Sequence, residues 1–166
     1  MQKLQDTTLL FLVRRNGDKI SEVCLAMKKR GFGQGRWNGV GGKVSVGESL
    51  ECATRREAEE EIGVRVGRME KVAELTFIFP HNPAWDQLVH TYITEGWQGE
   101  PKESKEMSPA WFATSDIPFA FMWPDDILWL PQVLYGKRIR AHFTFAEHDI
   151  IMNQQMETVK DFQVSK

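Results

Sequence analysis

Three glutamates spaced for one helix face are the residues of this sequence best suited to chemistry. Glu57, Glu60 and Glu61 stand at positions i, i+3 and i+4, so a helix places their carboxylates side by side. Like charges at this spacing repel one another and weaken an isolated helix. A hard divalent cation bound by the carboxylate oxygens would offset this repulsion. The spacing therefore favours a metal site.

The segment around these glutamates has recognisable helix boundaries. Ser49 can act as an N-cap, and Gly63 stands where a C-terminal cap belongs. The less polar positions between them are Leu50, Ala53, Thr54, Ala58 and Ile62. We therefore expect one helix between Ser49 and Gly63, with an acidic face and a packing face.

Composition places the chain among ordinary globular proteins. Its 166 residues predict one domain spanning residues 1–166, and 42% are hydrophobic and 27% charged. A formal net charge of −2 provides no long-range attraction to nucleic acid polymers or anionic membranes. We find no membrane-spanning run and no secretory signal, and Cys24 and Cys52 match no metal pattern. A cytoplasmic protein is expected.

Short apolar runs predict the strands. They cover residues 9–13, 20–27, 64–66, 72–79, 88–94, 111–113 and 141–146. A second helix is expected to start around Trp123 and to reach Tyr135, with an interruption at Pro131. Residues 99–107 are expected to form a surface loop, and after Glu147 we assign little beyond a short strand near Ile150. Strands and helices without regular alternation predict the α+β class with a mixed sheet.

The acidic helix belongs to a longer pattern. Gly42, Glu48, Arg56, Glu57, Glu60, Glu61, Gly63 and Val64 have the types and spacing of the Nudix box, so residues 42–64 resemble the signature of that hydrolase family. Ala58 departs from the pattern, in which a larger aliphatic residue is usual. A solvated acidic helix is the alternative, but it does not explain why the glycines, Glu48 and Arg56 are in register. The resemblance implies the Nudix fold, a mixed β-sheet between α-helices.

The resemblance to the Nudix family also implies a ligand set. Glu57, Glu60 and Glu61 would bind Mg²⁺, with Mn²⁺ as an alternative ion, and the carbonyl of Gly41 would complete the cluster. The family cleaves nucleoside diphosphates linked to another group. A metal-dependent hydrolase is therefore expected.

Other box residues would support the catalytic chemistry. By the same resemblance, Arg56 would hold the glutamates in place and pair with Glu48. The identity of the general base stays open, with Glu61 favoured and Glu60 next. Glu106, in the polar loop, is a candidate for a further metal ligand, and a solvated loop acid is the alternative.

A second resemblance covers nearly the whole chain and concerns the substrate. Residues 27–33, 36–39 and 122–126 are similar to segments of the animal-type MutT proteins. Those proteins hydrolyse oxidised purine nucleoside triphosphates, such as 8-oxo-dGTP and 2-hydroxy-dATP, to monophosphate and pyrophosphate, and so sanitise the nucleotide pool. The expected partner is a small nucleoside triphosphate, bound by a monomer. Gln87 departs from that family, whose pocket usually has methionine there, which leaves the preference among modified purines open.

This second resemblance implies a base-binding pocket. Asn38, Asp125 and Asp126 would read the base, and Trp123 would stack on it. The remaining residues implied to line the pocket or its edge are Phe32, Phe77, Met107, Trp129, Phe145, Thr8 and Lys28. Taken alone, these residues are better explained as a turn residue (Asn38), a helix cap (the aspartates) and a core residue (Trp123). Together with the Nudix box, the base-binding role is favoured.

The chemistry of the aspartate pair can be argued independently. Two adjacent carboxylates in a partly dry site do not both ionise readily, because repulsion and desolvation raise one pKa. One can donate a hydrogen bond while the other accepts, and exchanged roles would suit both oxidised guanine and oxidised adenine. Two other functions stay open: a Nudix hydrolase acting on other nucleotides or capped RNA, and a non-catalytic nucleotide-binding module.

Overall fold

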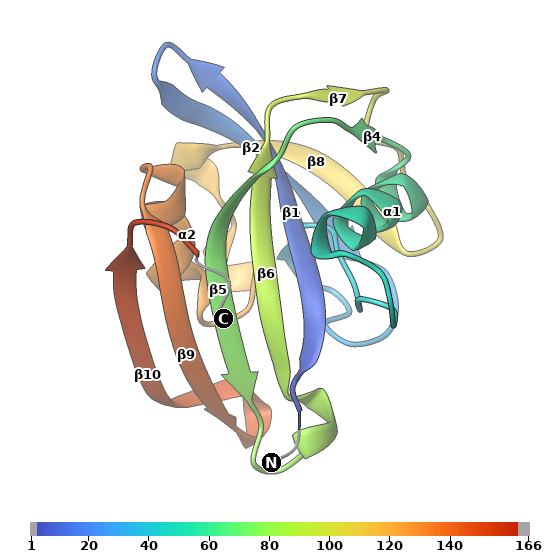
Figure 1. The fold of residues 1–166 in the computed structure, drawn as a ribbon. Coiled ribbons are helices and arrows are strands. Elements are labelled where there is room, and N and C mark those ends of the chain that lie inside the picture. The colour runs from blue at the N-terminus through green and yellow to red at the C-terminus, as the bar shows by residue number, and fades with distance from the viewer. Residues whose placement is uncertain (1–2, 163–166) are drawn as a thin grey trace.

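A mixed sheet forms the centre of the molecule, as the computed structural model of residues 3–162 shows (Figure 1). Its strands are β1 (Gln5–Asn16), β2 (Lys19–Lys28), β3 (Trp37–Asn38), β5 (Glu70–Ile78), β6 (Gln87–Thr94), β8 (Met107–Ala113), β9 (Arg138–Ala146) and β10 (Ile150–Val159). Their order is β10-β9-β5-β6-β1-β2-β3, and β8 also pairs with β2. The pairs β1–β6 and β5–β9 are parallel and the others antiparallel. The short strands β4 (Arg65–Val66) and β7 (Trp97–Gln98) form a separate pair.

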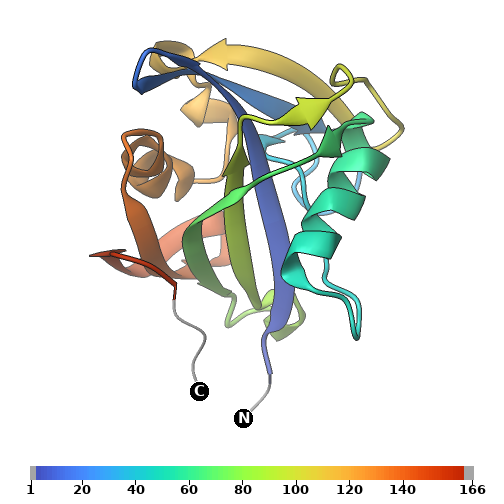
Figure 2. The same ribbon diagram turned by 45° about the horizontal axis from the view of Figure 1, so that its top comes forward.

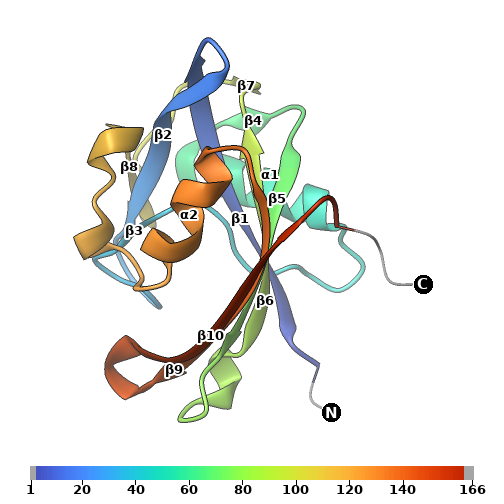
Figure 3. The same cartoon turned by 90° about the vertical axis from the view of Figure 1, so that its left-hand side faces the viewer.

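The two α-helices of the described chain cover opposite faces of the sheet (Figure 3). Helix α1 (Leu50–Ile62) lies alongside β1 (Figure 2) and buries Ala58 and Ile62 against Leu10 and Leu12. Helix α2 (Asp126–Leu134) contributes its buried side chains to a second hydrophobic cluster on the other face. The predicted α+β class, with a mixed sheet between helices, is confirmed.

Local sequence accounts for the ends of α1. The side chain of Ser49 accepts a hydrogen bond from the backbone N–H of Cys52 at 3.1 Å. At the other end Gly63 has φ of 70°, and its N–H bonds to the carbonyl of Glu59. The helix predicted between Ser49 and Gly63 is therefore confirmed at both boundaries.

The region after Glu147 was predicted incorrectly. Instead of a short strand near Ile150, the structure has the ten-residue strand β10, which pairs with β9 along its length. Most of its residues are exposed on both faces, so no apolar alternation marks it in the sequence. Pairing with β9, rather than burial, makes this segment a strand.

The starts of β8 and α2 also differ from the sequence prediction. Strand β8 begins at Met107, within the predicted surface loop, because residues 107–113 pair with β2 from Lys28 to Glu22. Helix α2 begins at Asp126 and continues through Pro131 to Leu134. The carboxylate of Asp125 makes no capping bond to the backbone. It lines a cavity between the sheet and α2 instead.

Candidate active site

Arg56 organises the acidic face of α1. Its guanidinium binds both oxygens of Glu48, at 2.8 Å from Nε and 3.0 Å from Nη2. Its Nη1 lies 2.9 Å from Glu57 and 3.4 Å from Glu60. The hydrogen bonds from Arg56 are the main reason that the pKa of Glu48 is lowered to about 2. The predicted pairing of Arg56 with Glu48 is confirmed.

Glu61 is the buried acid of this face. Its side chain is 7% exposed, and one carboxylate oxygen, Oε2, has no hydrogen-bond partner. Burial is the main reason that its pKa is raised to about 8, and the hydrogen bond and charge of the neighbouring Glu57 contribute to this rise. Glu61 is therefore the acid of this face whose ionised form is disfavoured in the absence of a cation.

A glycine pair allows the backbone to approach these acids. A Cβ atom at Gly42 would lie 2.5 Å from Oε1 of Glu57, and one at Gly41 would collide with the carbonyl of Thr8. The N–H of Thr8 in β1 donates to the carbonyl of Gly42 at 2.9 Å, which holds this approach in place. Gly41 is also hydrogen-bonded to Glu61 through its backbone. Residues larger than glycine would separate the loop from the helix.

The chemistry of these donors fits a divalent cation. Carboxylate and carbonyl oxygens are the ligands that hard cations prefer, and the unpartnered oxygen of Glu61 is a donor that a cation would satisfy. Within residues 3–162 no three acidic, histidine or cysteine side chains converge as a complete ligand set.

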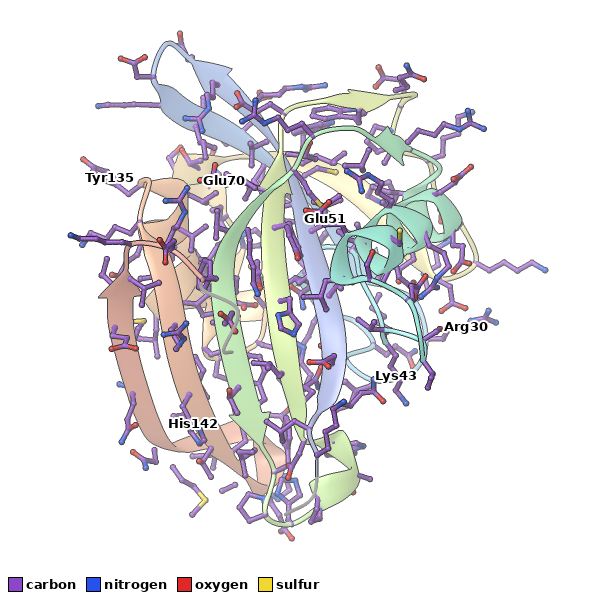
Figure 4. All side chains as sticks on the ribbon, viewed as in Figure 1. Arg30, Lys43, Glu51, Glu70, Tyr135 and His142 are labelled. Atoms are coloured by element: carbon purple, nitrogen blue, oxygen red, sulfur yellow. The ribbon has the colours of Figure 1, made fainter. Side chains whose placement is uncertain are left out.

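The structure brings Glu106 to Arg30. Nε of Arg30 lies 2.8 Å from Oε1 of Glu106, and this hydrogen bond is the main reason that the pKa of Glu106 is lowered. The backbone reinforces the contact, since the N–H of Lys29 donates to the carbonyl of Glu106 at 2.8 Å. Arg30 and Lys43 lie on the α1 side of the molecule, far from His142 of β9 (Figure 4). Glu106 is thus a surface acid with an arginine partner.

A cavity of about 420 Å³ lies between the sheet and α2. Every residue that was predicted to contact the base lines this cavity. These are Thr8, Lys28, Phe32, Asn38, Phe77, Met107, Trp123, Asp125, Asp126, Trp129 and Phe145. Gly41 and Gly42 also line it, so the cavity extends from the aspartate pair to the glycine pair beside the acidic helix.

Aromatic rings form the walls of this cavity. The rings of Phe32 and Trp123 lie 5.0 Å apart with an angle of 30° between their planes. Phe79 and Phe145 are stacked at 5.3 Å. Flat apolar walls of this kind suit an aromatic ligand of similar shape.

The aspartate pair forms the polar end of the cavity. Asp125 and Asp126 are 2% and 3% exposed. Nε1 of Trp129 donates to Oδ2 of Asp125 at 2.8 Å, whereas Oδ2 of Asp126 has no partner. Burial raises the pKa of both acids, and the charge of Asp125 raises that of Asp126 further. Asp126 is therefore the acid of the pair that ionises less readily, so that the pair can present both a donor and an acceptor.

Two further polar groups face the same space. Oγ1 of Thr8 is buried and has no hydrogen-bond partner. Oδ1 of Asn38 accepts from the N–H of Gly39 at 2.8 Å, which orients the amide. With the aspartates, these groups can recognise the polar edge of a planar ligand.

Sequence reasoning did not assign several cavity residues. Arg36 lies over the Trp123 ring, and Trp85 packs against Phe32 at 5.1 Å. Gln87 accepts from Oγ1 of Thr7 at 3.1 Å. Gln5 lies opposite Gln87 in the pairing of β1 with β6. This register would have identified both residues as members of the cavity wall. Arg36 lies within residues 36–39, for which the resemblance predicted a role only at Asn38, and nothing local in the sequence marks Trp85.

The comparisons with known proteins agree with this geometry. A family model described as NUDIX domain matches residues 3–133. The chain is 46% identical over 139 residues to the oxidized purine nucleoside triphosphate hydrolase of Danio rerio, covering 84% of this chain and 88% of that protein. It is 44% identical over 140 residues to the Mus musculus protein of the same name, covering 84% and 89%.

A solved structure has the same fold. The MutT protein of Bacillus halodurans matches with a TM-score of 0.79 and 23% identity, over 93% of this chain and 98% of that one. Neither helix within residues 3–162 has the length and apolar character needed to cross a bilayer.

Proposed function

The chain belongs to the Nudix family of hydrolases, and from this we propose that it hydrolyses oxidised purine nucleoside triphosphates to monophosphate and pyrophosphate. One observation carries the choice of substrate: an aromatic-walled cavity ends at two buried aspartates whose pKa values are both raised. Relatives named for this activity are 44% and 46% identical over most of the chain. 8-Oxo-dGTP and 2-hydroxy-dATP are the substrates proposed.

The base is read by the polar end of the cavity. Protonated Asp126 donates to the base while Asp125, hydrogen-bonded to Trp129, accepts. The amide of Asn38 can both donate and accept. Trp123 stacks on the base, and Phe32, Phe77, Met107 and Phe145 provide apolar walls. Oxidised guanine and adenine present different donor patterns, which the aspartates match by exchanging the proton.

The phosphates extend along Gly41 and Gly42 towards α1. We propose Mg²⁺, with Mn²⁺ as a substitute, held by Glu57, Glu60, Glu61 and the carbonyl of Gly41. When bound, the ion neutralises diphosphate oxygens and lowers the pKa of water. Glu106 remains a predicted additional ligand, and its carboxylate would have to leave Arg30 in order to serve.

Proton transfer is assigned to α1. Glu61 accepts the proton of the water that attacks the β-phosphorus, a role supported by its burial on the acidic face and by its carboxylate oxygen without a hydrogen-bond partner. Glu60 is the second candidate for this role. Arg56 acts on the chemistry by holding Glu57 and Glu60 in place.

We also propose that residues 1–166 form one domain, which acts in the cytoplasm as a monomer on free nucleotides. The net charge of −2 supports a small substrate rather than a nucleic acid polymer.

Release of pyrophosphate tests the proposed function. Purified protein should hydrolyse 8-oxo-dGTP much faster than dGTP, and only when Mg²⁺ or Mn²⁺ is added. Failure to turn over any modified purine triphosphate would refute the proposal. In Asp125→Asn combined with Asp126→Asn, an unchanged preference between the two substrates would refute the assignment of the base site.

A further inference from the structure

Arg36 connects the wall of the cavity with the turn between β9 and β10. It stands immediately before β3, and its guanidinium carbon lies 4.0 Å from the centre of the Trp123 ring. Its Nη2 lies 2.8 Å from Oδ2 of Asp149, in the turn between β9 and β10. The two side chains of this ion pair are only 29% and 27% exposed. Solvent therefore screens the contact less than it would an ordinary surface pair.

The backbone of Arg36 is fixed as firmly as its side chain. Its carbonyl accepts from the N–H of Lys28 at 3.1 Å, and its own N–H donates to Gly33 at 3.1 Å. Gly33 also approaches the indole closely, since a Cβ there would lie 3.4 Å from Nε1 of Trp123. Because hydrogen bonds hold both the backbone and the guanidinium of Arg36, its side chain has little freedom to move above the Trp123 ring.

The turn that carries Asp149 is strained. His148 and Asp149 have φ of 63° and 56°, and among residues 3–162 they are the non-glycine residues with positive φ. Two successive side chains in the left-handed region cost free energy that the surrounding structure must offset. The ion pair with Arg36 is one such compensating contact.

We propose that Arg36, held by Asp149, is a positioning residue that orients the Trp123 indole and thereby determines affinity for the base. This inference depends on the proposed function, which assigns Trp123 to base stacking. A cation above an indole is attracted to its face, so the pair prefers one relative orientation. Arg36 also lowers the pKa of Asp125 by its charge, which links the wall of the cavity with its polar end.

The chain provides a matched control for this arrangement. The guanidinium of Arg14 lies 3.7 Å from the centre of the Trp111 ring and pairs with Glu22 at 3.3 Å. This second set of arginine, tryptophan and acid lies outside the residues that line the cavity. Its loss should change stability without changing substrate affinity.

Steady-state kinetics with 8-oxo-dGTP form the first arm of the test. We expect Arg36→Gln to raise KM about tenfold and to leave kcat within about twofold. Asp149→Asn should raise KM about threefold, and the double variant should resemble Arg36→Gln because the two residues act as one unit. Arg36→Lys should recover part of the loss, and Arg14→Gln and Glu22→Gln should leave KM within about twofold.

The indole N–H resonance of Trp123, assigned with Trp123→Phe, forms the second arm and does not depend on turnover. It should shift in Arg36→Gln and Asp149→Asn but not in Arg14→Gln. An unmoved resonance together with an unchanged KM would overturn the positioning role, as would equal KM effects from the control pair. If the wild-type protein hydrolyses no modified purine triphosphate, the proposed function fails, and the resonance alone decides whether Arg36 orients the indole.

Discussion

Two pairs of neighbouring acids in this protein include members whose pKa values are raised. Asp125 with Asp126 and Glu57 with Glu61 each combine burial with a like-charged neighbour. The unpartnered oxygens of Asp126 and Glu61 lie within these pairs. Each buried pair lowers the stability of the ligand-free protein. The aspartate pair can bind the polar edge of a base, and the glutamate pair can bind a cation.

The pH dependence of stability should report the aspartate pair. The pKa of Asp126 in the folded state lies well above the ordinary 3.8, so the folded state binds more protons than the unfolded state above about pH 4. Its contribution to the free energy of unfolding is therefore lost as pH rises from about 4. In urea unfolding from pH 4 to 8, Asp126→Asn should flatten this decline and be more stable by about 1–3 kcal/mol at pH 8.

Asp116→Asn is the control for that measurement, because Asp116 is exposed. It should retain the slope of the wild-type protein. An Asp126→Asn profile parallel to the wild-type profile would show that Asp126 is ionised in the folded state.

Glu61→Gln tests the assignment of the general base. We expect kcat to fall by about 10³-fold, because the amide cannot accept the proton. The melting temperature should not fall, since the amide fills the same buried site without a charge. Glu59→Gln is the matched control on the exposed side of the same helix, where Glu59 pairs only loosely with Arg65 at 3.7 Å. Wild-type rates for Glu61→Gln would remove Glu61 from the mechanism.

At the scale of elements, Arg56 connects α1 to the turn that precedes it. It binds Glu48 before the helix and Glu57 and Glu60 on the helix, and its Nη2 also donates to the carbonyl of Lys43 at 3.1 Å. One cation therefore fixes the distance between the glycine loop and the acidic face. The neighbouring Arg55 instead binds the carbonyls of Val66 and Gly67.

Loss of Arg56 should weaken the metal site rather than the fold. In Arg56→Gln the Mg²⁺ concentration for half-maximal activity should rise about 10–100-fold, as expected when a residue that orients metal ligands is removed. Titration of activity against Mg²⁺ measures this change. Arg55→Gln, which removes an equal charge one position away, should change it less than about threefold, and equal effects of the two variants would contradict the role of Arg56.

At the scale of the molecule, the sheet separates the two halves of the site. The cavity lies on the α2 face with the cluster that includes Leu75 and Trp129, whereas the glutamates lie on α1, on the opposite face. The segment from Asn38 to Gly42 pairs with β1 through Thr8 and contributes residues to the cavity. Because this segment connects the cavity with the acidic helix, the residues that bind the base and those that act on the phosphates can contact the same nucleotide.

If residues 1–166 are one domain, a change in the core of α2 should destabilise the whole chain. Leu130 is fully buried, so Leu130→Ala should lower the free energy of unfolding by about 2–5 kcal/mol. Unfolding followed by tryptophan fluorescence and by far-UV circular dichroism should give one coincident transition. Tyr135 projects into solvent near the end of α2 (Figure 4) and is 85% exposed, so Tyr135→Ala should change stability by less than about 0.5 kcal/mol. Separate transitions would argue for two units.

The sequence by itself determined the features that depend on local chemistry. Helix α1, with its cap at Ser49 and its C-terminus at Gly63, follows from backbone hydrogen bonding within a few residues. The fold class followed from the pattern of elements and from the Nudix box. The residues predicted for the pocket were found through family resemblance, and they line one cavity.

Tertiary structure decided what depends on distant partners. Strand β10 exists because β9 pairs with it, and its exposed residues leave no apolar pattern to read. Arg36 and Asp149 are 113 positions apart, and their meeting over Trp123 depends on how the sheet brings loops together. Glu106 was a candidate ligand by residue type, yet Arg30 holds it in this structure. Local preferences act over a few residues, whereas these contacts arise from packing across the whole chain.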